Sequence, residues 1–93
     1  MEMQQVRYFV ALADTLNFTR AAEKCNVSQP ALTRAIQQLE HEFGGPLFHR
    51  ERGNTHLSEL GRMMLPYLQT VDEQTKAARE QARAVKRIRI SMA

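Results

Sequence analysis

The sequence predicts a mainly α fold, in which a winged helix-turn-helix of three helices and a two-stranded wing precedes one long helix. Three observations support this prediction. Two stretches with helical periodicity, within residues 17–40, are joined by a three-residue turn. Gly44-Gly45-Pro46 then ends the helical pattern, because two glycines favour a turn and proline cannot continue a helix. Short alternating segments follow, and after them a heptad-like apolar stripe runs over residues 57–85.

The first helix is expected at about residues 2–16. Its apolar residues form an arc that is wider than a single helix contact requires. They are Val6, Phe9, Val10, Leu12, Ala13 and Leu16. We expect one half of the arc to cover the core and the other half to meet a second element or a second subunit.

The next two helices have the features of a helix-turn-helix. Asn17 can cap the first of them, and the small residues Ala21 and Ala22 let another helix cross at close range. Ser28 can cap the helix predicted at residues 28–43, whose first turn tolerates Pro30 because its missing N–H is not needed there. The apolar face of that helix consists of Leu32, Ile36, Leu39 and Phe43.

The opposite face of helix 28–43 carries amide, hydroxyl and guanidinium groups. Groups of this kind can hydrogen-bond to base edges in the major groove of DNA. An ordinary solvated helix face would have a similar composition, but the turn and the small-residue crossing favour a DNA-reading helix. The base-reading candidates are Gln29, Pro30, Thr33, Arg34 and Gln37.

A hairpin, the wing, is predicted after the glycines. Residues 47–50 and 55–57 form two short strands, and Gly53-Asn54 in the connection is typical of a tight turn. Arg50 and Arg52 on this wing can contact the minor groove or the DNA backbone, although a solvated hairpin is the alternative. The full set of backbone-contacting candidates is Thr19, Arg20, Ser28, Arg50 and Arg52.

A long linker or dimerisation helix is predicted for residues 58–85. Its stripe is too long for so small a domain to bury, so part of it is expected to meet a second copy of the chain. Pro66 is expected to bend this helix rather than end it. The dimerisation candidates are Met64, Leu68, Val71, Thr75, Ala78, Ala82 and Val85.

The last residues, 86–93, contain the alternating pair Ile88 and Ile90. This alternation predicts the start of a strand, and with it the start of a further domain that is missing from this chain. The alternative is a frayed basic tail. The organisation predicted is therefore a DNA-binding domain at 1–57, a linker helix at 58–85 and the first residues of another domain at 86–93.

Composition restricts the function classes. The net charge is only +3, and the basic excess falls in residues 58–93, so the local placement of arginines supports DNA binding better than net charge does. The chain has no apolar run of membrane-spanning length, no signal peptide and a single cysteine, which together predict a cytoplasmic protein with no membrane contact.

The sequence gives little support for an enzymatic function. The three histidines, at positions 41, 49 and 56, are spread over a helix and two strands, and no carboxylate or cysteine joins them at metal-ligand spacing. Cys25 lies on the apolar side of its helix without a neighbouring base. The sequence therefore predicts no catalytic residue, no metal and no cofactor in this segment, and the chain is expected not to be an enzyme.

Several motifs follow one another in a specific order. They are Arg7-Tyr8-Phe9-Val10, the run from Phe18 to Lys24, the run from Val27 to Glu40, Phe43-Gly44, Pro46-Leu47-Phe48, Arg50, Leu57-Ser58 and Gly61. Together they resemble the amino-terminal domain of LysR-type transcriptional regulators over essentially the whole chain.

This resemblance implies a sequence-specific regulator that binds an interrupted inverted repeat in double-stranded DNA as a homodimer. It places Gln29, Pro30, Thr33 and Arg34 on the DNA-facing surface and Arg50 and Arg52 in the wing. It further implies antiparallel pairing of linker helices, a possible tetramer of the full-length protein, and a carboxy-terminal domain that binds a small-molecule inducer. The alternative is a helical protein-protein interaction module without DNA binding, since a fold does not determine a function.

Overall fold

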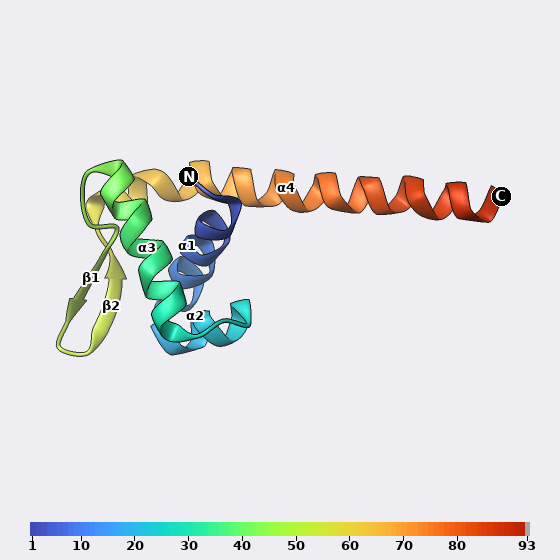
Figure 1. The fold of residues 1–93 in the computed structure, drawn as a ribbon. Helices are drawn as coiled ribbons and strands as arrows, with labels where there is room; N and C mark the ends of the chain where they lie inside the picture. Colours follow the sequence, from blue (N-terminus) through green and yellow to red (C-terminus); the bar gives the residue numbers. More distant parts are fainter. Residues whose placement is uncertain (93) are drawn as a thin grey trace.

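A computed structural model describes residues 1–92, which form four helices and a two-stranded antiparallel sheet (Figure 1). The elements are α1 (Met3–Thr15), α2 (Phe18–Cys25), α3 (Gln29–Phe43), β1 (Phe48–Glu51), β2 (Asn54–Leu57) and α4 (Glu59–Met92). The first three helices and the hairpin gather at one end of α4, and the rest of α4 extends away from them (Figure 1). The predicted mainly α, winged helix-turn-helix fold is confirmed.

Local capping explains where the first three helices begin and end. Leu16 adopts a left-handed conformation (φ 51°) that ends α1 one residue earlier than predicted. The Asn17 side chain accepts a hydrogen bond from the Arg20 N–H at 2.9 Å and starts α2. Asn26, also left-handed, ends α2, and the Ser28 hydroxyl accepts from the Ala31 N–H at 3.2 Å to start α3. The predicted three-residue turn is thus present and Ser28 caps α3 as predicted, so the helix itself begins at Gln29, one residue after the predicted bound.

The core joins one face of each of these helices to the base of the wing and to α4. Helix α1 contributes four large buried side chains, more than any other element, and α2 contributes the small residues that permit close crossing. The buried side chains include Val6, Tyr8, Phe9, Leu12, Ala21, Ala22, Leu32, Ile36, Leu39, Leu47, Phe48 and Leu68. This packing fixes the orientation of α3, so its polar face points outward.

The wing has a tighter turn than the sequence indicated. β1 and β2 pair from Phe48 opposite Leu57 to Glu51 opposite Asn54, which leaves only Arg52-Gly53 in the connection. Both turn residues have positive φ (51° and 80°), the geometry that matches the natural twist of a two-residue hairpin. The predicted strand bounds are therefore corrected by one residue at their turn ends, and Leu47 lies before β1.

The start of α4 is fastened to the segment before the wing. Ser58 is buried, its N–H donates to the Leu47 carbonyl at 2.9 Å, and its hydroxyl donates to the Pro46 carbonyl at 2.6 Å. The same hydroxyl accepts from the Gly61 N–H at 2.9 Å. A Cβ at Gly61 would overlap the Leu47 carbonyl, so this junction requires glycine.

The first part of α4 packs on α1 and belongs to the same core. Leu68 is only 2% exposed, and Met64 and Val71 pack partly buried beside it. The assignment of Leu68 to a dimer contact is therefore corrected, because its side chain is buried within its own subunit. Thr75 is partly buried, whereas Ala78, Ala82 and Val85 are exposed.

The second part of α4 contradicts the strand predicted at residues 86–93. The helix passes through Pro66 without ending and continues to Met92, with Ile88 and Ile90 exposed on it. Alanine, lysine and arginine favour helix, and the segment contains no glycine or proline to stop it, so these propensities outweigh the two alternating isoleucines. Residue 93 lies outside the described residues. Within residues 1–92, no helix combines the length and apolar character needed to span a membrane.

Candidate nucleic-acid interface

The outer face of α3 brings the five base-reading candidates together. Gln29, Pro30, Thr33, Arg34 and Gln37 line one open hollow on the surface, and all of them except the partly buried Thr33 are exposed. Since the opposite face of α3 is held in the core, these side chains cannot rotate inward. The structure places them as predicted, and their contact with DNA stays a prediction.

The start of α2 reaches the start of α3 through a side-chain hydrogen bond. The Thr19 hydroxyl donates to the Gln29 side-chain oxygen at 3.3 Å. This contact leaves the Gln29 NH₂ group free to donate toward an acceptor on a base edge. Thr19 was predicted only as a backbone contact, so its place beside Gln29 is a feature that the sequence did not indicate.

The remaining backbone candidates surround this face. Arg20 and Ser28 are exposed at the amino-terminal ends of α2 and α3. The two wing arginines lie at different places on the hairpin. Arg52 occupies the turn, whereas Arg50 is on β1, with its guanidinium carbon 3.7 Å from the centre of the Phe18 ring. Arg50 is therefore directed toward the helix-turn-helix and Arg52 is at the tip of the wing.

A second hollow lies between α3 and the wing. Its lining includes Thr33, Gln37 and Glu40 of α3 together with Arg50 of the wing, and Phe18, Ile36 and Phe48 supply its apolar part. The Glu40 carboxylate accepts a hydrogen bond from the Leu47 N–H at 2.7 Å, which ties the segment before β1 to α3. The wing is thus held at a defined position relative to α3.

Ionisable groups away from α3 have structural roles. Lys24 pairs with Asp14 at 2.8 Å, and the hydrogen bond between them lowers the pKa of Asp14 and raises the pKa of Lys24. Burial raises the pKa of the Cys25 thiol, which keeps it in the neutral form that packs as a small apolar group. These directions agree with a packed thiol and a surface ion pair.

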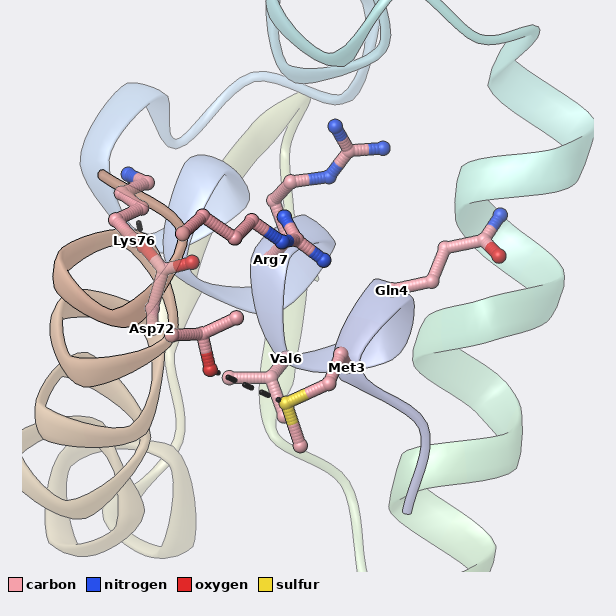
Figure 2. Close-up of a pocket in the computed structure, with 8 residues that line it drawn as sticks. Met3, Gln4, Val6, Arg7, Asp72 and Lys76 are labelled. Carbon is pink, nitrogen blue, oxygen red and sulfur yellow. Dashed lines mark hydrogen bonds and ion pairs between the residues drawn. The ribbon is translucent and has the colours of Figure 1, made fainter. Parts of the chain in front are cut away.

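The structure also contains a crevice between α1 and α4 that the sequence did not indicate. It is lined by Arg7 on α1 and by Asp72, Lys76 and Arg79 on α4, with Lys76 paired to Asp72 at 3.0 Å (Figure 2). Arg7 is 65 or more positions from the three α4 residues in the chain, so no local motif connects the two sides of the crevice. In the part of the chain that the structure describes, no group of three His, Cys, Asp or Glu side chains is arranged to hold a metal ion.

The fold and the polar face of α3 define a winged helix-turn-helix protein. Residues 3–62 match the family described as bacterial regulatory helix-turn-helix protein, lysR family. The chain therefore belongs to the LysR family.

Curated relatives agree with this assignment. The chain is 46% identical over 68 residues to the HTH-type transcriptional regulator IlvR of Caulobacter vibrioides, a match that covers 73% of this chain and 23% of IlvR. It is 42% identical over 85 residues to the Hca operon transcriptional activator HcaR of Escherichia coli, covering 91% of this chain and 29% of HcaR. The matched segments thus span about a quarter of the length of IlvR and HcaR.

Solved structures show the same fold. The CbnR DBD–DNA complex is matched with a TM-score of 0.79 and 32% identity, covering 92% of this chain and 99% of that chain. The complex of the BenM DBD with benA site 1 DNA is matched with a TM-score of 0.80 and 30% identity, covering 91% and 99%. Full-length OxyR C199D from Pseudomonas aeruginosa is matched with a TM-score of 0.83 and 39% identity, covering 90% of this chain and 28% of OxyR.

Proposed function

We propose that this chain is the sequence-specific DNA-binding segment of a transcriptional regulator, which inserts α3 into a major groove and lays the wing beside it. The observation that carries the proposal is the cluster of Gln29, Pro30, Thr33, Arg34 and Gln37 on the one face of α3 that the core leaves outside. The CbnR and BenM complexes support it, because both proteins are bound to DNA and the match to this chain covers 99% of each of them.

The roles of the individual side chains follow from their positions. Gln29 and Thr33 lie one turn apart on α3 and can enter a groove together, and Arg34 lies at the edge of that face, within reach of a guanine or a phosphate. Arg20, Ser28 and the wing arginines contact the backbone and set the register. A protein-binding module would instead need exposed apolar anchors on this face.

The test of this function is a binding selection on randomised DNA with the unaltered chain, Gln29→Ala and Thr33→Ala. Each substitution is expected to lose about 1–3 kcal/mol of discrimination at particular base pairs while non-specific affinity changes little. The selected bases should recur as an interrupted inverted repeat. Identical base preferences in all three proteins would remove α3 from this role, and failure of a mobility shift at low and high salt would favour the protein-interaction alternative.

The active form proposed is a homodimer with antiparallel α4 helices. The support is an exposed strip on the second half of α4, formed by small and apolar side chains with long polar ones beside them. The strip consists of Ala78, Gln81, Ala82, Val85, Lys86 and Arg89.

Sedimentation tests the dimer. Ala78→Glu combined with Val85→Glu would place like charges at the contact and should give monomers, whereas Gln74→Glu, on an exposed position outside the strip, is the control. If the unaltered chain sediments as a monomer at high concentration, the proposed pairing through this strip is wrong.

For the whole protein we propose a cytoplasmic, non-enzymatic regulator with an inducer-binding carboxy-terminal domain and assembly into dimers or tetramers. The support is family membership, together with the relatives IlvR and HcaR, which are named as transcriptional regulators and are about three times as long as this chain. Ligand screening by thermal shift on the full-length protein, with this segment alone as the control, tests the inducer site.

A further inference from the structure

Arg50 is an exposed residue whose side chain packs on an aromatic ring. Its guanidinium carbon lies 3.7 Å from the centre of the Phe18 ring, well within the range of a cation–π contact. The Phe18 ring also packs edge-on against the core residue Phe48, with 6.5 Å between ring centres, and this contact holds it in place. The stack therefore connects a strand of the wing to the first residue of α2.

This contact leaves the hydrogen-bonding capacity of Arg50 unused. A cation over an aromatic ring engages the positive charge and consumes no N–H donor. Within residues 1–92, none of the ion pairs involves Arg50, although Glu40 lines the same hollow. The N–H groups of the guanidinium are available to an anion from outside the chain.

The location of Arg50 indicates which anion it meets. Arg50 shares the hollow between α3 and the wing with Thr33 and Gln37, two of the base-reading candidates. When those side chains face a major groove, the groove is bordered by phosphodiester groups, and the hollow between helix and wing lies along that border. A backbone phosphate is thus the anion that reaches this position.

We propose that Phe18 is a positioning residue that holds the Arg50 guanidinium ready to bind a DNA backbone phosphate beside α3, an inference that rests on the proposed DNA binding. A free arginine side chain loses conformational entropy when it is fixed by a ligand, and this loss weakens binding. The stack restricts the Arg50 side chain before DNA binds, so less conformational entropy is lost when the phosphate is bound. Arg52, in the hairpin turn, has no such aromatic partner among the described residues.

Binding to a duplex of arbitrary sequence tests the proposal, because phosphate contacts do not depend on base identity. Phe18→Leu keeps apolar volume and removes the π face, and it should weaken the affinity about 2- to 5-fold, the equivalent of an exposed cation–π contact. Phe18→Tyr retains the π face and should bind within about 2-fold of the unaltered chain. The salt dependence should persist in Phe18→Leu and decrease by about one unit of slope in Arg50→Ala.

A double-substitution cycle separates positioning from a general structural effect. Phe18→Leu should have no further effect in the Arg50→Ala background but its full effect in the Arg52→Ala background. The same loss in both backgrounds would overturn the proposal, because it would show that Phe18 acts through the fold. An equal loss in Phe18→Tyr and Phe18→Leu would overturn it as well.

The stack itself is measurable without DNA. In the free, unaltered chain, the Arg50 side-chain protons should show upfield ring-current shifts in NMR spectra, and these should vanish in Phe18→Leu. Their absence overturns the inference whatever the binding data. If the shifts are present and the chain binds no duplex at low salt, both the proposed function and the positioning role are wrong; binding without coupling in the cycle rejects the positioning role alone.

Discussion

The two halves of α4 share one sequence pattern and lie in different environments. In the first half, Leu68 and Asp72 are only 2% and 8% exposed, because this half packs on α1. In the second half, residues 76–91 are all exposed, and the helix extends away from the rest of the chain (Figure 1). A heptad-like stripe therefore indicates that side chains need a partner and does not indicate which partner.

The crossing of α1 and α4 explains where the change occurs. α1 runs away from α4 at a steep angle (Figure 1), so it contacts only one stretch of that helix. At about 1.5 Å per residue, the 34 residues of α4 span about 51 Å and extend well beyond this contact. The crevice at Arg7, Asp72, Lys76 and Arg79 lies where the contact ends.

Amide hydrogen exchange should reveal the largest difference between the two halves. Amides of residues 64–75 are expected to exchange only on global unfolding, whereas those of residues 78–91 should exchange orders of magnitude faster in dilute monomer, since an unpacked helix is marginal in water. Raising the protein concentration should slow exchange in the second half alone if it pairs with another copy. Uniform protection along α4 in dilute solution would refute the distinction.

Truncation of one side chain in each half should affect the free energy of unfolding very differently. Leu68→Ala opens a cavity between α4 and α1 and is expected to cost about 2–5 kcal/mol. Val85→Ala should hardly change the free energy of unfolding of the monomeric chain, because the Val85 side chain is 42% exposed. Urea denaturation at low protein concentration measures both, and similar losses would mean that the second half is packed within its own subunit.

The junction that begins α4 should be sensitive to a single methyl group. Gly61→Ala would push its Cβ against the Leu47 carbonyl, a rigid backbone group, and overpacking of this kind costs about 1–3 kcal/mol. Gly45→Ala is the matched control, because its Cβ would meet only the flexible end of Leu60 at 3.4 Å. Thermal unfolding of the two variants should separate them clearly, and equal midpoints would show that the junction can shift.

Sequence analysis predicted the elements whose signals are local. The caps at Asn17 and Ser28, the small crossing residues of α2 and the two faces of α3 are all defined by residues within a few positions of one another. The hairpin was found for the same reason, although its turn is Arg52-Gly53 rather than Gly53-Asn54. The strand predicted at residues 86–93 is wrong because helix propensity over the whole segment outweighs the short alternation of Ile88 and Ile90.

The site was predicted as a set of residues and not as a set of contacts. The outer face of α3 follows from helical periodicity, so its five candidates lie together as expected. The contacts from Thr19 to Gln29 and from Arg50 to Phe18 depend on how α2, α3 and the wing pack, which no local pattern specifies. An aromatic residue at the start of a helix and an arginine on a strand become informative only when the tertiary structure brings them together.

The smallest expected effect concerns the ion pair at the boundary between the two halves of α4. Lys76 reaches Asp72 at 3.0 Å, but the lysine side chain is 64% exposed and the aspartate side chain only 10%. Lys76→Gln should therefore lower the free energy of unfolding by less than about 1 kcal/mol, as is usual for a pair with one solvated partner. Arg7 and Arg79 line the same crevice and leave positive charge near the Asp72 carboxylate after the change.

Urea denaturation in low and high salt measures the effect of Lys76→Gln, which should decrease as salt increases. Lys24→Gln, which breaks the exposed pair with Asp14 near the carboxyl end of α1, is the control and should show a similarly small, salt-sensitive change. A loss of about 3 kcal/mol or more for Lys76→Gln would instead show that Asp72 is left as an uncompensated buried charge, and that the packed half of α4 extends further than the exposed lysine indicates.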